Sequence, residues 1–74
     1  MNRDHNTLRE VGTALYGPMF QLALGDALDV SDRTIRRWIN GEYPIPPGIW
    51  PELAALCRDS SKALTELAAK LDAS

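Results

Sequence analysis

Apolar residues recur at intervals of three and four along most of the chain, and no sustained stretch alternates apolar with polar residues. This spacing puts the apolar side chains on one face of a helix, whereas a half-buried strand would need an interval of two. Glycine and proline interrupt the pattern at 17–18 and again at 41–47. The sequence therefore predicts an all-α fold built from short helices.

The first two helices are predicted from their boundary residues. The first begins at Thr7, because Thr7 and Glu10 have the spacing of a capping box. Gly17 can end this helix, and Pro18 suits the first turn of the next, so the second helix follows without a linker. Its apolar positions repeat at i, i+3, i+4, i+7 and i+8 and predict an end near Leu28.

Three further helices follow from the same signals. Ser31 is a good N-cap for the third, which Gly41 can close in a left-handed conformation. A proline-rich loop comes next, and the fourth helix begins within 47–51. Asp59 or Ser60 can cap a fifth helix. We therefore expect a compact five-helix domain that spans residues 1–74.

Length limits how such a chain can be stabilised. A domain of 74 residues has one small core and is marginally stable without a further device. The single cysteine, Cys57, has no partner for an intramolecular disulfide, and Cys and His residues are too few for a metal site. We expect Cys57 to be a small core residue and His5 to be solvated, with no cofactor and no metal. Dimerisation is the stabilising device that is left.

The chain has no apolar run as long as the roughly 18 residues of a membrane-spanning helix. Its polar start, residues 1–5, precedes no apolar signal core. We therefore expect no membrane association and a cytoplasmic location, which suits an unpaired cysteine.

The third predicted helix has two different faces. Ile35, Trp38 and Ile39 are three and four positions apart and form an apolar face, so we expect Trp38 in the core rather than stacked on a base. We expect the same of Trp50 in the fourth helix. The opposite face is polar and basic and carries Arg33, Arg36, Arg37 and Asn40.

Overall charge does not by itself favour nucleic-acid binding. Ten acidic and eight basic residues give a net charge of -2, the wrong sign for bulk attraction to phosphate. Three of the arginines nevertheless fall within 33–37, whereas the acidic residues are spread along the chain. Such a cluster is either a contact surface for nucleic acid or a solvated helix face.

The pattern Gln21-x-x-x-Gly25-x-x-x-Asp29-Val30-Ser31-x-x-x-Ile35-x-x-Trp38-x-Asn40-Gly41 resembles the phage-repressor-like, or XRE-type, helix-turn-helix. The resemblance covers residues 21–41 and implies a lambda-repressor-like DNA-binding domain. Two positions depart from the family pattern, Gly25 in place of alanine and Asp29 in place of glycine. The segment 41–46 and the tryptophan-bearing helix after it are similar to short regulators carried by phages and mobile elements.

The resemblance implies that the third helix lies in the major groove of DNA. The residues that would read base edges are Asp32, Arg33 and Arg37. Arginine suits guanine, which shows two acceptors there to a planar guanidinium. Asp32 has two interpretations, since it can accept from a cytosine amino group or can simply favour the positive end of the helix dipole.

Five other polar residues would contact the phosphate backbone and fix the orientation of the domain without reading sequence. They are Gln21, Ser31, Thr34, Arg36 and Asn40. Helix capping is the alternative for Ser31, Thr34 and Asn40.

The sequence thus predicts a sequence-specific binder of double-stranded DNA, a small transcriptional regulator that represses by occluding a promoter. We expect a homodimer on a pseudo-palindromic operator, with a contact formed by the helices at about 48–72, and no small-molecule effector. We expect no enzyme, because no nucleophile accompanies a base and an orienting group. The alternative is a protein-interaction module, or an antitoxin-like partner protein, that uses the helix-turn-helix only as a fold.

Overall fold

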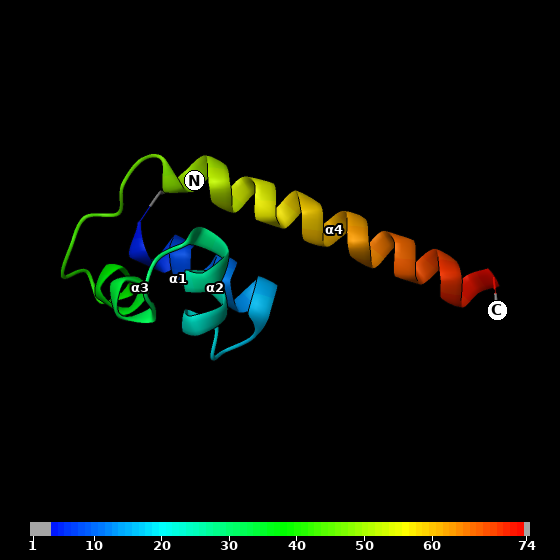
Figure 1. Ribbon diagram of the computed structural model, residues 1–74, viewed down its shortest axis with the longest axis horizontal. Helices are drawn as coiled ribbons and strands as arrows, with labels where there is room; N and C mark the ends of the chain where they lie inside the picture. Colours follow the sequence, from blue (N-terminus) through cyan, green and yellow to red (C-terminus); the bar gives the residue numbers. More distant parts are fainter. Residues whose placement is uncertain (1–3, 74) are drawn as a thin grey trace.

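The computed structural model describes residues 4–73, which form four helices and no strand (Figure 1). The helices are α1 (His5–Tyr16), α2 (Gln21–Leu28), α3 (Asp32–Ile39) and α4 (Ile49–Ala73). The all-α prediction is confirmed, whereas the prediction of five helices is wrong. None of these helices is both long enough and apolar enough to cross a bilayer.

A single apolar core joins the four helices, and α1 lies at its centre in contact with each of the others. Residues from every helix, together with Phe20 in the turn before α2, build this core. Its buried members are Leu8, Phe20, Leu24, Leu28, Ile35, Trp38, Ile39, Ile49 and Leu53. Only the first turns of α4 contribute to it, so the core supports α1, α2 and α3 but not the far end of α4.

Helix α1 begins at His5 rather than at the predicted Thr7. Its N-cap is Asp4, whose Oδ1 accepts a hydrogen bond from the backbone N–H of Thr7 at 3.0 Å and another from the Thr7 hydroxyl at 3.2 Å. The hydrogen bond from the Thr7 backbone N–H lowers the pKa of Asp4 below its usual value. An aspartate three residues ahead of Thr7 thus takes the capping role predicted for Thr7 itself.

The turn between α1 and α2 is longer than predicted. Gly17 ends α1 with a φ of 87°, as expected of a glycine, but α2 begins at Gln21 and not at Pro18. The intervening turn places the Phe20 ring against Gly12 of α1, where any Cβ would overlap the ring. The prediction that α2 ends at Leu28 is confirmed.

The predicted fourth and fifth helices are one continuous helix, α4, of 25 residues. The sequence suggested a break at Asp59 or Ser60, yet neither glycine nor proline occurs after Pro51 to enforce one. Inside the helix, the Thr65 hydroxyl donates to the Ser61 carbonyl at 2.9 Å. Cys57, expected in the core, is exposed, because α4 leaves the core before this position.

Candidate nucleic-acid interface

Helices α2 and α3 are joined by the short turn 29–31, and Gly25 allows them to approach closely. A Cβ at Gly25 would lie 2.7 Å from the Val30 carbonyl oxygen, so alanine does not fit without a backbone shift. Val30 N–H in turn donates to the Gly25 carbonyl at 2.9 Å. Asp29 adopts a left-handed conformation with φ 59° and ψ 44°. The close contact therefore explains glycine at position 25, and Asp29 tolerates the left-handed conformation that this turn requires.

The apolar face of α3 anchors the helix in the core. Ile35 is fully buried, and Trp38 and Ile39 are buried with it, which confirms the predicted core position of Trp38. Trp50 of α4 is half-buried and packs against the same cluster. Because one face of α3 is fixed in this way, its other face is held in a set orientation toward solvent.

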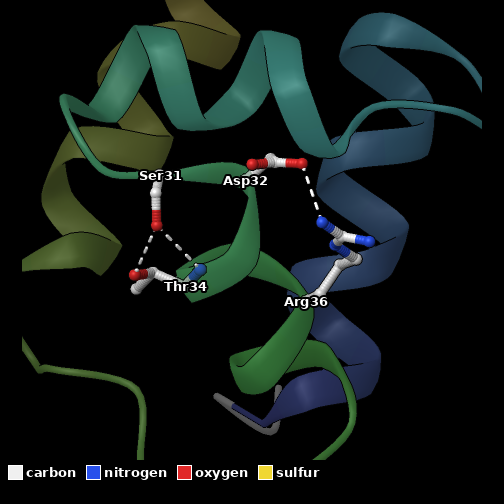
Figure 2. A network of polar contacts seen from close by, with 4 residues as sticks. All are labelled: Ser31, Asp32, Thr34 and Arg36. Atoms are coloured by element: carbon white, nitrogen blue, oxygen red, sulfur yellow. Dashed lines mark hydrogen bonds and ion pairs between the residues drawn. The ribbon is translucent and has the colours of Figure 1, made fainter.

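Ser31 caps the start of α3, as predicted. Its Oγ accepts from Thr34 N–H at 3.1 Å and lies 2.9 Å from the Thr34 hydroxyl oxygen (Figure 2). The structure thus shows both residues in the capping interaction, with Ser31 as the N-cap and Thr34 as its partner. Contact of either with phosphate remains a prediction, and Ser31 is exposed enough to make one.

Asp32 and Arg36, one turn apart on α3, form an ion pair in which their Oδ2 and Nη2 atoms are 2.9 Å apart (Figure 2). Both side chains are well exposed, at 43% for Asp32 and 59% for Arg36. A helical pair of this kind contributes only about 0.3–0.5 kcal/mol. Asp32, predicted to read bases, and Arg36, predicted to bind phosphate, are therefore paired with each other. The pair is weak enough for either side chain to exchange its partner for another polar group.

The other two arginines of α3 differ in their surroundings. Arg33 is exposed and makes no hydrogen bond or ion pair within residues 4–73. The guanidinium of Arg37 lies 5.2 Å from the centre of the Tyr43 ring, a cation–π distance. Sequence reasoning missed Tyr43, because nothing in the loop 41–48 indicates that it folds back on α3.

The end of α3 is closed by backbone groups. Asn40 is the C-cap, and its N–H donates to the Arg36 carbonyl at 3.0 Å, while Gly41 takes the predicted left-handed conformation with φ 76°. Glu42 N–H donates to the Arg37 carbonyl at 2.9 Å. The exposed side-chain amide of Asn40 has no hydrogen bond in the described part of the chain, so it is not used in capping.

Gln21, at the start of α2, is half-buried and lies beside Asp32 and Arg36. These three residues line a shallow hollow of about 350 Å³ together with Met19 and Leu22. The last two are strongly exposed, at 88% and 64%. The structure thus brings together residues predicted separately in two helices and adds an apolar rim that the sequence analysis did not anticipate.

The exposed face of α3 is positively charged although the whole chain is negative. Its three arginines and one aspartate leave two positive charges in eight residues, against a net charge of -2 for the chain. In residues 4–73 no group of three or more His, Cys, Asp or Glu side chains is arranged to hold a metal ion. The three guanidinium groups make this face a donor of hydrogen bonds.

Comparison with protein-family models, with curated proteins and with solved structures found no match to this chain.

Proposed function

We propose that this chain binds double-stranded DNA through the polar face of α3 and acts as a sequence-specific transcriptional regulator. The observation that carries the proposal is the two-sided character of α3. One side is buried through Ile35, Trp38 and Ile39, and the other presents Arg33 to solvent with no partner in the described chain. A charged side chain held this way suits a contact with another molecule better than a contribution to stability.

The dimensions of a helix suit the proposed site. An α-helix with its side chains is about 10–12 Å across, and the major groove of B-DNA is about 12 Å wide. Arg33 and Arg37 lie one turn apart and would read base edges, with guanine as the preferred partner. The Tyr43 ring beside Arg37 would restrict that guanidinium before DNA arrives.

The remaining polar residues would position the domain. Gln21, Ser31, Thr34 and Asn40 lie at the starts of α2 and α3 and at the end of α3, where they would contact phosphates. Arg36 would exchange Asp32 for a phosphate oxygen, which costs little because the pair is exposed. Asp32 would then face a cytosine amino group or remain at the helix dipole.

The resemblance to the phage-repressor-like family supports the same function and adds its mode. A short regulator of that kind represses by covering a promoter, works in the cytoplasm and needs no small-molecule effector. The continuous α4 departs from the five-helix lambda-repressor-like arrangement, so the support from the resemblance comes from α2, α3 and the turn between them, which residues 21–41 contain.

The test begins with selection of bound duplexes from random DNA, followed by affinity measurements on the selected site. We expect Arg33→Ala with Arg37→Ala to lower affinity at least tenfold, since each bidentate guanine contact gives about 1–3 kcal/mol of discrimination. Arg9→Ala with Arg58→Ala is the matched control, because it removes the same charge from exposed positions on α1 and α4. Equal loss in both double variants would refute a specific site on α3.

Salt dependence gives a second readout from the same duplex. Each phosphate contact adds about 0.9 to the slope of log affinity against log salt concentration. We expect Arg36→Ala to reduce this slope by about 0.9, the value of one phosphate contact, without changing which sequence is selected.

A protein-interaction module is the second candidate, and the exposed Met19 and Leu22 beside α3 favour it. Under this hypothesis, selection from random DNA would enrich no duplex sequence. Leu22→Ala would abolish binding to a protein partner and would leave DNA binding unaffected. Failure of the random-DNA selection to enrich any duplex is the outcome that supports this candidate over the first.

A further inference from the structure

The second half of α4 extends away from the rest of the molecule (Figure 1). All of its residues from Ser61 onward are exposed in the described chain, whereas Ile49 and Leu53 at the start of the helix are buried. The molecule is consequently elongated, with extents of 48 × 23 × 19 Å. Its radius of gyration is 13.8 Å, whereas a compact domain of this length has about 11 Å.

This exposed half carries an apolar stripe. Leu64, Leu67 and Leu71 are exposed at 64%, 53% and 75%, and their spacing of three and four places them on one side of the helix. Leu67 lies two heptads after the buried Leu53, with Ser60 between them, so the stripe lies on the same side of α4 as Leu53. The charged Lys62 and Glu66 lie on the other side.

Small residues flank the stripe and would let another helix approach closely. They are Ser61, Ala63 and Ala68. At the inner end of the stripe, an open apolar groove of about 450 Å³ lies between α1 and α4. Ala14 and Leu15 form its α1 side, and Ser60 and Leu64 are among the residues on its α4 side. The stripe and the groove are thus one continuous apolar surface.

The exposed area of the chain matches what a dimer requires. The molecule exposes 5365 Å², which is about 800 Å² more than a compact monomer of 8.2 kDa would expose. Each partner of a standard protein interface buries about 800 Å². The elongated shape thus leaves an extra exposed area of the same order as one partner buries in a standard interface, and a second copy of the chain supplies a surface of the same apolar character.

We propose that a second copy of this chain covers this surface, with the two α4 helices antiparallel and Leu64 of each against Leu67 of the other. In this register Leu71 reaches Ser60 of the partner subunit and fills the groove beside the partner's Ala14. A parallel pairing would place Leu71 against its own counterpart and leave the groove open. The antiparallel arrangement is the one that covers both parts of the apolar surface.

The pairing is inferred from α4 and the end of α1 and does not depend on DNA. Together with the proposed function it would present two α3 helices to one duplex, so that the operator is expected to be pseudo-palindromic. Sedimentation in the absence of DNA tests the pairing separately from DNA binding. The mass of the chain then shows whether two copies associate, and this result does not depend on what α3 binds.

Sedimentation equilibrium of the full chain from micromolar to millimolar concentration tests the pairing. We expect the wild-type mass to rise to twice 8.2 kDa, and Leu64→Glu with Leu67→Glu to give a monomer of unchanged helicity, because neither leucine belongs to the core. The matched control is Ala55→Glu with Ala69→Glu, which adds the same charge on the opposite side of α4 and should remain dimeric. A wild-type chain that stays monomeric, or a leucine variant that stays dimeric, overturns the proposal.

Disulfide formation between mixed chains tests the direction of the helices. In a Cys57→Ser background, one chain carries Ser60→Cys and the other Leu71→Cys. The antiparallel pairing predicts that oxidation joins the two different chains. Predominant joining of each chain to its own kind would indicate parallel helices and overturn the proposed arrangement.

Discussion

The polar face of α3 and the second half of α4 are both exposed, but they differ in what lies beneath them. The opposite side of α3 from its arginines carries the buried Ile35, Trp38 and Ile39. Residues 61–73 of α4 are exposed on every side of the helix. The charged side chains of α3 are therefore held in place by the core beneath them, whereas the leucine stripe of α4 is exposed apolar surface with no core beneath it.

The two helices also form for different reasons. An isolated helix of eight residues is not stable in water, so α3 depends on its packing and on the Ser31 cap. The second half of α4 is rich in alanine, leucine, lysine and glutamate, which are strong helix formers. Its helical state therefore follows mainly from local preference, and its sequence leaves the leucine stripe available to a partner.

The largest effect should come from the core beneath α3. Ile35→Ala removes a fully buried side chain and is expected to lower the free energy of unfolding by about 2–5 kcal/mol. Leu64→Ala, measured in a chain kept monomeric by Leu67→Glu, should change it by less than about 0.5 kcal/mol. Urea denaturation followed by circular dichroism measures the free energy of unfolding of both variants. Similar losses in the two would show that Leu64 contributes to stability as much as the buried Ile35 does.

A smaller loss is expected from Gly25→Ala, in the contact that orients α3. The new Cβ would lie 2.7 Å from the Val30 carbonyl oxygen, and the required backbone shift should cost about 1–3 kcal/mol. After a gain of about 1 kcal/mol in helix propensity, the expected net loss is up to about 2 kcal/mol. Gly48→Ala is the control, because its Cβ would meet nothing within 4 Å. Thermal unfolding compares the two, and a stabilised Gly25→Ala chain would contradict the close approach.

A smaller effect, on DNA affinity, is expected from the ion pair on the charged face of α3. Asp32→Asn removes the carboxylate that holds Arg36 and should tighten binding to random-sequence duplex about two- to fivefold, since such a pair is worth under about 1 kcal/mol. Asp26→Asn, an exposed position on α2, controls for the change in net charge. Fluorescence anisotropy at low salt measures both, and weaker binding by Asp32→Asn would show that the carboxylate itself contacts DNA.

The smallest effect concerns the N-cap of α1, the helix that contributes Leu8 to the shared core. Because the Thr7 N–H lowers the pKa of Asp4 in the folded state, the ionised cap stabilises the fold above the unfolded pKa, and this contribution is lost as pH falls through the folded pKa. Asp4→Asn lacks this dependence. Melting temperatures from about pH 5 to about pH 2 should fall more steeply for the wild type, and parallel curves would count against the ionised cap.

Much of the α2 to α3 region could be predicted from the sequence. Ser31 as N-cap, Gly41 as a left-handed residue, the end of α2 at Leu28 and the burial of Trp38 all follow from local chemistry and helical spacing, and all are observed. These features are determined by residues a few positions apart, which is the range that sequence patterns report.

The features that escaped prediction depend on competition or on distant contacts. Asp4 displaced Thr7 as the cap because two good capping residues lie within one turn. Capping residues at 59–60 did not break α4, because a residue able to cap does not force a helix to end. The contact of Arg37 with Tyr43 depended on the path of the loop, which no spacing rule supplies. The ion pair of Asp32 with Arg36 was open to prediction, because oppositely charged residues four positions apart are neighbours on a helix.

A nuclear magnetic resonance titration of the isotope-labelled chain with a short DNA duplex at low salt tests whether DNA binds the arginine face of α3 and not the second half of α4. We predict that backbone amide signals of residues 31–40 and of Gln21 shift as DNA is added, while those of residues 61–69 keep their positions. Shifts concentrated in α4 with none in α3 would contradict the assignment of DNA to the arginine face.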